Sequence, residues 1–186
     1  MQSMVIIAML TRSCLIWSSD TVAMNLSKNF SLKELTASSI AVRHGVEEQF
    51  KPPPQAMVNM TALTQNVLQK VRDQFGSVRV TSCFRHPHVN EIVGGSSTSD
   101  HCCSFTKAAA DFEVISEDVS NLELAIWIRD NLRYSQLILE FYNPDEGPNS
   151  GWVHVSYDSV DQDNKMEVLT ASRVKGKVKY TPGLPE

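Results

Sequence analysis

The stretch "SQLILEFYNPDEGPNSGWVHVSY", Ser135 to Tyr157, decides the fold. Its two apolar segments, "SQLILEFY" and "GWVHVSY", are rich in β-branched and aromatic residues and predict two strands. The connector "NPDEGPNS" is rich in turn-forming residues, so the two strands are expected to pair. Side chains alternate along a strand, which places Trp152, His154 and Ser156 on the same face.

Further strands are predicted on both sides of this stretch. The segment "VRVTS", Val78 to Ser82, alternates apolar and polar residues as a half-buried strand does. The apolar run "AAADFEV" predicts another strand, which ends at Val114. The tail "KMEVLTASRVKGKVKYTPGL" is expected to add a short edge strand.

Helices are predicted before and between these strands. In "NFSLKEL", Ser31 is placed to cap a helix and Glu34 to complete a capping box. Apolar residues recur at three- and four-residue steps from Met57 to Phe75, which predicts a long amphipathic helix with Gly76 at its end. The segment "SNLELAIWIRDNL" predicts a second helix. The residues from Cys83 to Lys107 are expected to form a long ordered loop.

The order of these elements indicates the fold class. Helices and strands mix without a regular βαβ repeat, which predicts an α+β fold with one mainly antiparallel sheet and helices packed on one side. The 186 residues suit a single domain, which we assign to residues 24–186. We assign residues 1–23 to an N-terminal extension outside the domain. A weak signal segment is the alternative, although Arg12 interrupts the apolar run that a signal peptide needs.

Composition excludes several classes of protein. Hydrophobic residues make up 42% and charged residues 20% of the chain, as in globular proteins. The formal net charge of -4 gives no electrostatic basis for a nucleic-acid partner or an anionic membrane partner. No segment approaches the roughly 20 apolar residues of a transmembrane helix. The four cysteines lack C-x-x-C spacing, so neither a disulfide framework nor a cysteine zinc site is favoured.

Three residues are candidates for a metal site: His101, Asp111 and His154. Two imidazoles and one carboxylate supply three ligands for zinc and leave a fourth position for water. Asp111 and His154 each lie on a predicted strand, which holds a side chain firmly. A histidine between Val153 and Val155 is also compatible with a hydrogen-bonded core residue, so the spacing alone leaves both interpretations open.

Four segments in order resemble the M15 family of zinc peptidases, which includes D-alanyl-D-alanine carboxypeptidases and phage peptidoglycan endopeptidases. They are "FSLKELTAS", "VTSCFRHPHVNEIVGGSSTSDH", "AAADFEV" and "ILEFY…GWVHVSY", and the final "YTPGL" also fits. The resemblance covers about two-thirds of the chain, from Phe30 to Tyr157. It implies a zinc D-Ala-D-Ala peptidase-like fold and a Zn²⁺ cofactor.

The resemblance also implies roles for individual residues. His101, Asp111 and His154 would be the zinc ligands, and Ser99 would brace the loop that carries His101. Arg85 would hold the terminal carboxylate or a peptide carbonyl of the substrate, which suits a guanidinium group. Glu140 is the candidate general base, because zinc-dependent hydrolysis needs a carboxylate to accept a proton from water.

The sequence departs from the family pattern at three places. Nine residues separate His101 from Asp111, about three more than is usual, a lengthening that a loop tolerates. Cys83 stands where glycine is common. Gly151 stands where some members have an acidic residue, which leaves Glu140 as the base. Cys102 is an alternative metal ligand to His101, because thiolates bind zinc well.

These observations predict a monomeric zinc metallopeptidase that cuts peptidoglycan stem peptides, as a D-alanyl-D-alanine carboxypeptidase or an endolysin-type endopeptidase. A phage-type lysin, made in the host cytoplasm and acting on the cell wall, is the favoured context, and an exported periplasmic enzyme is the alternative. The rival hypothesis is a catalytically inactive structural or cell-wall-binding domain of the same fold. It requires the nine-residue spacing to keep His101 and Asp111 apart.

Overall fold

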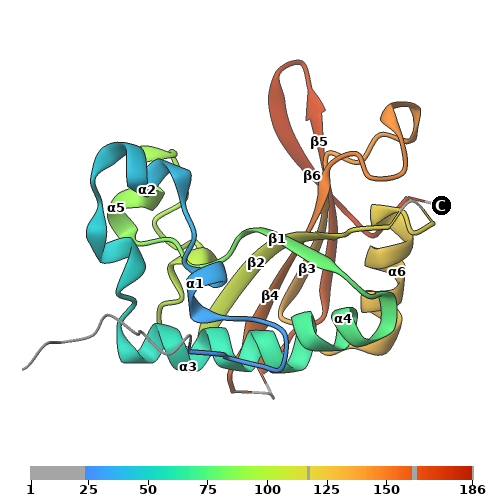
Figure 1. The fold of residues 1–186 in the computed structure, drawn as a ribbon. Helices are drawn as coiled ribbons and strands as arrows, with labels where there is room; N and C mark the ends of the chain where they lie inside the picture. Colours follow the sequence, from blue (N-terminus) through green and yellow to red (C-terminus); the bar gives the residue numbers. More distant parts are fainter. Residues whose placement is uncertain (1–23, 117, 161–162, 186) are drawn as a thin grey trace, which may run out of the picture.

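The computed structural model describes residues 24–116, 118–160 and 163–185 (Figure 1). The predicted extension, residues 1–23, lies outside the described residues. No helix among the described residues is long and apolar enough to cross a membrane.

A six-stranded sheet forms the centre of the fold (Figure 1). The spatial order of the strands is β1 (Val78–Ser82), β2 (Lys107–Val114), β4 (Trp152–Asp158), β3 (Gln136–Glu140), β5 (Glu167–Val174) and β6 (Lys177–Pro182). Neighbouring strands are antiparallel except β3 and β5, which are parallel. The prediction of an α+β fold with a mainly antiparallel sheet is therefore confirmed.

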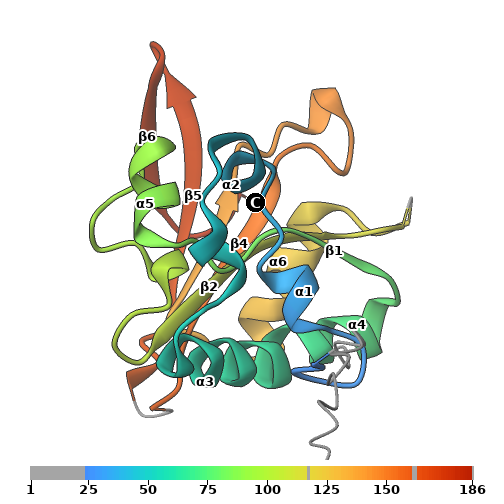
Figure 2. The same cartoon turned by 60° about the vertical axis from the view of Figure 1, so that its left-hand side comes forward.

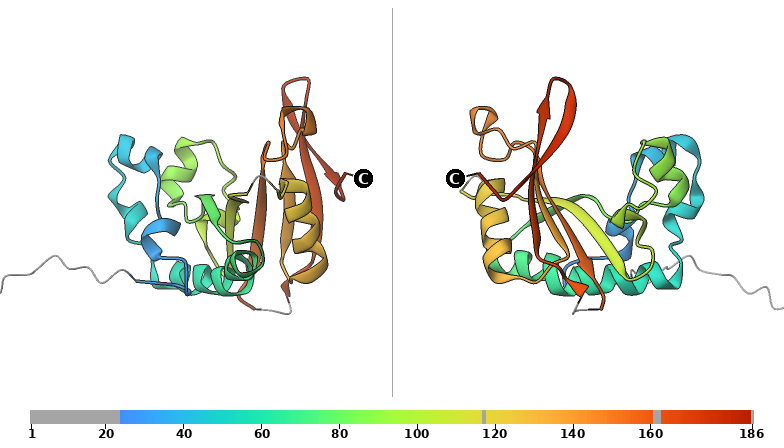
Figure 3. Two further views of the ribbon diagram at one scale, coloured as in Figure 1. Left: turned by 45° about the vertical axis from the view of Figure 1, so that its right-hand side comes forward. Right: turned by 180° about the vertical axis from the view of Figure 1, so that it is seen from behind.

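Three helices cover one face of the sheet: α3 (Pro54–Leu63), α4 (Gln69–Phe75) and α6 (Asn121–Asn131) (Figures 1 and 3). A π-helical turn, η2 (Thr64–Leu68), joins α3 to α4, so the predicted long helix exists but begins earlier, at Pro54. Proline suits this position, because the first turn of a helix does not need its N–H group. Helix α6 begins at Asn121, and the N-cap residue before it, Ser120, forms a capping box with Glu123.

The main core lies between these helices and the sheet. Alternate residues of each central strand point into it, because side chains alternate across a sheet. The strand residues that pack there are Ala108, Ala110, Phe112, Leu137, Leu139, Val153 and Val155. The other face of the same strands carries Asp111, Ile138, Glu140 and His154, which line a pocket. One face of the sheet therefore packs into the core, and the opposite face is available for a functional site.

Short helices lie beside the β1 edge (Figure 2). They are α1 (Leu32–Leu35), α2 (Ser39–His44), η1 (Glu47–Phe50) and α5 (Pro87–Ile92). Ala41, Val46 and Val89 form a small second core that packs α2 against α5. Ser31 caps α1 as predicted by accepting a hydrogen bond from the backbone N–H of Glu34.

The structure corrects two predictions about irregular segments. The segment from Cys83 to Lys107 is not a continuous loop, since it contains α5 and the 3₁₀ turn η3 (Asp100–Cys102). Helices this short leave little periodicity in a sequence. The tail forms a hairpin of two strands, β5 and β6, rather than one edge strand. Lys175 and Gly176 both have positive φ angles at its turn, 51° and 78°, as tight hairpins require.

Candidate active site

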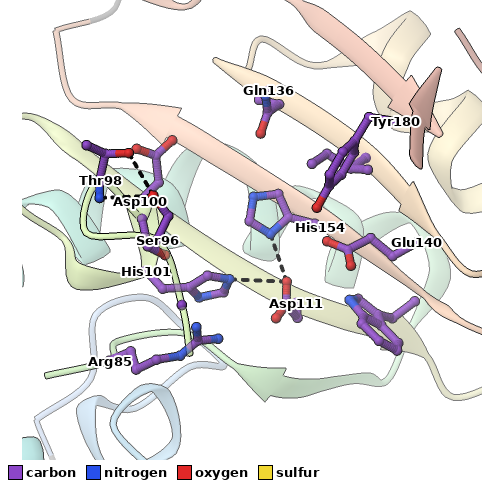
Figure 4. A pocket seen from close by; sticks show the side chains of 14 residues that line it. Arg85, Ser96, Thr98, Asp100, His101, Asp111, Gln136, Glu140, His154 and Tyr180 are labelled. Carbon is purple, nitrogen blue, oxygen red and sulfur yellow. Dashed lines mark hydrogen bonds and ion pairs between the residues drawn. The ribbon is translucent and has the colours of Figure 1, made fainter. Parts of the chain in front are cut away.

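The three predicted metal ligands lie together on the open face of the sheet (Figure 4). Asp111 on β2 stands directly opposite His154 on β4, and His101 comes from η3. Asp111 Oδ1 is 2.8 Å from His154 Nδ1 and 3.3 Å from His101 Nε2. One ligand atom from each of the three residues lies within 4.8 Å of the others, so the group could hold a metal ion.

His101 is oriented by a backbone contact on the far side of its ring. Its Nδ1 lies 2.8 Å from the carbonyl oxygen of Cys83. A carbonyl oxygen only accepts hydrogen bonds, so Nδ1 carries a proton, and Nε2 is the nitrogen that faces Asp111. His101 is buried, with 5% of the residue exposed. A buried imidazole held in this tautomer is the usual arrangement for a metal ligand, and the two-histidine, one-carboxylate set fits zinc.

The surroundings of Asp111 keep its carboxylate charged. Burial alone would raise its pKa, but the charge of His101 and hydrogen bonds with both histidines outweigh that effect. The pKa of Asp111 therefore lies well below its ordinary value. A carboxylate that is ionised throughout the neutral range is ready to bind a cation.

The nine-residue segment between His101 and Asp111 is accommodated without displacing either residue. Cys103 and Phe105 adopt left-handed backbone conformations, with φ of 50° and 56°, which turn the chain back into β2. Asn59 of α3 is buried and donates hydrogen bonds from Nδ2 to the carbonyl oxygens of both residues, at 3.1 and 3.0 Å. The Ser159 hydroxyl contacts Asn59 Oδ1 at 3.0 Å. This brace was not predicted, because its partners are far apart in the sequence.

The cysteines in the described part of the chain are not members of the candidate metal group. Cys102 lines a neighbouring pocket with Pro87 and Asn90, so the structure does not support it as a replacement for His101. Cys83 and Cys103 are buried, and burial raises the pKa of the Cys103 thiol to about 12. The three cysteines among the described residues, Cys83, Cys102 and Cys103, are free thiols.

Arg85 lies beside the metal group at the edge of the same pocket (Figure 4). Its guanidinium donates hydrogen bonds to Asn90 Oδ1 and to Ser82 Oγ, both at 3.2 Å. Within the described residues it forms no ion pair. Two neutral partners fix the orientation of the group and leave its positive charge available to an anionic ligand.

Ser99 precedes η3 and also lines the pocket. Its carbonyl oxygen accepts a hydrogen bond from the N–H of Cys102, and its own N–H donates to Ser96. The contribution of Ser99 to the loop therefore comes from its backbone.

Glu140 is at the end of β3 and points into the pocket (Figure 4). Burial raises the pKa of its carboxyl above the ordinary value, and the negative charge of Asp111 raises it further. The positive charges of His154 and Arg85 oppose this shift. A raised pKa brings the group closer to the range in which a carboxylate both accepts and returns a proton.

Gly151 lies three residues before His154, where the resemblance implies an acidic residue in some family members, and the backbone here does not permit one. Its φ is +66°, and a Cβ there would lie 2.0 Å from the carbonyl oxygen of Glu140. Glycine thus allows the backbone to pass close to β3, and that approach excludes a carboxylate at this position.

Replacing Gly151 with aspartate is expected to destabilise the protein rather than to supply a second base. The left-handed backbone and the contact with Glu140 should together lower the free energy of unfolding by about 2 kcal/mol or more. Urea denaturation measures this change. Gly45→Asp is the matched control, because Gly45 has the same φ of +66° with nothing within 4 Å. Equal losses in the two variants would show that the close approach is unimportant.

The pocket around these residues has a volume of about 520 Å³. Besides the predicted residues, Gln136, Trp152 and Tyr180 line it. The strand period had placed Trp152 on this face, but Gln136 and Tyr180 were missed. Tyr180 comes from β6, whose position in the sheet is not evident from sequence. Burial raises the pKa of its phenol, and Glu140 and Asp111 raise it further, so the hydroxyl stays protonated.

The family model described as peptidase M15 matches residues 28–144. The chain therefore belongs to the peptidase M15 family, whose members are zinc-dependent peptidases. The match includes Arg85, His101, Asp111 and Glu140 and ends before β4 and His154. No curated protein and no solved structure matches the chain.

Proposed function

We propose that this protein is a zinc-dependent peptidase that hydrolyses peptide bonds in peptidoglycan stem peptides. The observation that carries the proposal is the His101–Asp111–His154 group, which lines a pocket together with a separate carboxylate, Glu140. Membership in the peptidase M15 family supports the reaction class. The segments that resemble carboxypeptidases and phage endopeptidases of that family support the substrate.

Five residues of the pocket have chemical tasks under this proposal. His101, Asp111 and His154 would hold zinc, which when bound polarises the scissile carbonyl and lowers the pKa of water. Glu140 would accept a proton from the attacking water and return it to the leaving amine. Arg85 would bind a carboxylate or carbonyl of the peptide and fix its direction along the pocket.

The rival hypothesis was an inactive domain in which the long spacing separates His101 from Asp111. The two side chains approach to 3.3 Å, and ligands of one zinc ion lie at about that separation when each bond is about 2.0–2.2 Å. The geometry therefore favours an enzyme. We further propose that it acts as a monomer and as a phage-type lysin on the cell wall, with an exported periplasmic enzyme as the alternative.

The test is digestion of purified muropeptides with pentapeptide stems by the zinc-loaded protein, followed by mass spectrometry. Release of D-alanine would show carboxypeptidase action, and longer fragments would show endopeptidase action. Treatment with a chelator is expected to stop the reaction and added zinc to restore it. Intact muropeptides after digestion with zinc-loaded protein would contradict the proposed function.

A further inference from the structure

Tyr180 lies in a row of residues that crosses four strands. Trp152 on β4 stands opposite Glu140 on β3, Glu140 is beside Ala171 on β5, and Ala171 stands opposite Tyr180 on β6. Side chains of paired residues point to the same face of a sheet, so all four face the side that carries the metal group. Strands are about 4.8 Å apart, which places the backbone of Tyr180 about 10 Å from that of Glu140.

The small side chain of Ala171 allows the phenol to reach the pocket. Ala171 occupies the row between Glu140 and Tyr180 and is 1% exposed. A larger residue there would fill the space over β5. With alanine in this position the Tyr180 ring extends toward Glu140 and His154 and lines the same pocket (Figure 4).

Several contacts fix the hairpin that carries Tyr180. The Arg173 guanidinium lies 4.7 Å from the centre of the Phe141 ring, and that ring packs edge-on against Trp152. On the other side of the hairpin, the Thr170 hydroxyl donates a hydrogen bond of 2.7 Å to the carbonyl oxygen of Gly183. Tyr180 is therefore held in place by the sheet and not by a free loop.

The hydroxyl of Tyr180 is a donor without an acceptor in the described chain. It makes no hydrogen bond to any described residue, and 52% of the residue is exposed. Arg85 lies on the opposite side of the metal group (Figure 4). A peptide that crosses the pocket from Arg85 would thus meet a second donor beyond the metal group.

We propose that Tyr180 contacts the substrate and donates a hydrogen bond to an oxygen of the tetrahedral centre at the scissile bond. This inference rests on the proposed peptidase function. When the oxygen of water bonds to the carbonyl carbon, the carbonyl π electrons move to its oxygen and Glu140 takes the proton that the water loses. Charge develops on oxygen at that moment, and a positioned O–H group stabilises it.

The test compares the wild type with Tyr180→Phe, which removes only the hydroxyl. The control is Tyr142→Phe, because Tyr142 does not line the pocket. Two quantities are measured on zinc-loaded protein: the affinity for a phosphinate analogue of D-alanyl-D-alanine, by calorimetry, and kcat and KM on a stem peptide. Phosphinates resemble the tetrahedral centre, so their binding reports the contact without requiring turnover.

Tyr180→Phe is expected to weaken phosphinate binding at least about tenfold and to lower kcat about a hundredfold, with KM and zinc content nearly unchanged. Tyr142→Phe should match the wild type. Phosphinate affinity that is unchanged in Tyr180→Phe, or absent in the wild type, overturns the inference. A wild type that binds phosphinate through Tyr180 and cleaves no peptide would support the inference and reject the proposed function. Peptide cleavage by the wild type, together with unchanged phosphinate affinity in Tyr180→Phe, would support the proposed function and reject the inference.

Discussion

The variant His154→Ala is expected to lose both zinc and peptidase activity. His154 is the one proposed ligand that lies outside the residues matched by the family model, so its role is the most informative to test. Its Nδ1 is 2.8 Å from Asp111 Oδ1, and removing the ring leaves two ligands for a metal that needs three from the protein. Zinc per chain, measured by atomic absorption, should fall from about one to near zero.

Thermal unfolding gives a second measurement of the same variant. Zinc that binds only the folded chain raises the melting temperature of the wild type, and this increase should vanish in His154→Ala. His88→Ala is the control, since His88 is an exposed histidine outside the pocket. Hydrolysis that persists in His154→Ala, with zinc still bound, would reject the proposed metal centre.

The variant Glu140→Gln is expected to keep its zinc and to lose about 10²–10⁴-fold in kcat. Glutamine has nearly the same shape as glutamate, so the pocket should remain intact, but an amide cannot accept a proton from water. The measurement is steady-state kinetics on a stem peptide together with zinc content. Glu47→Gln is the control, because Glu47 is exposed on η1 and does not line the pocket.

Asp100 provides the competing assignment of the base. Among the described residues that line the pocket, Asp100 is the third residue with a carboxylate, besides Asp111 and Glu140. If Asp100→Asn stops hydrolysis while Glu140→Gln retains the wild-type rate, the general base is Asp100 and the proposed role of Glu140 is wrong.

Local patterns in the sequence predicted most of the sheet and the helices on its covered face. The strand Val78–Ser82 and the apolar stripe from Met57 to Phe75 follow directly from burial of one side of each element. The pairing of β5 with β3 was not predictable, because strand order depends on contacts between residues far apart in the chain. Helix α5 was missed because six residues are too few to show a helical period.

The candidate site, like the fold, was predicted only in part from the sequence. His101, Asp111 and His154 were chosen by residue type and by resemblance, and the structure brings them together. Asn59 and Tyr180 were missed because their positions depend on tertiary contacts. Asn59 donates a hydrogen bond to Cys103, which lies 44 residues later in the chain, and Tyr180 reaches the pocket through the register of three strands. The residue types that bind metal can be recognised in a sequence, whereas residues that a distant helix or strand brings to the site cannot.

The position of β4 between β2 and β3 has a consequence for synthesis of the chain. While a ribosome has made only the part up to Pro144, β2 and β3 exist without the strand that joins them. Each of these two strands then has an open hydrogen-bonding edge and an exposed apolar face. Chaperones bind surfaces of this kind, and chains that expose them tend to aggregate. The centre of the sheet closes only when β4 emerges, and His154 arrives with that strand. The centre of the sheet and the metal group are thus completed together, when β4 joins β2 and β3.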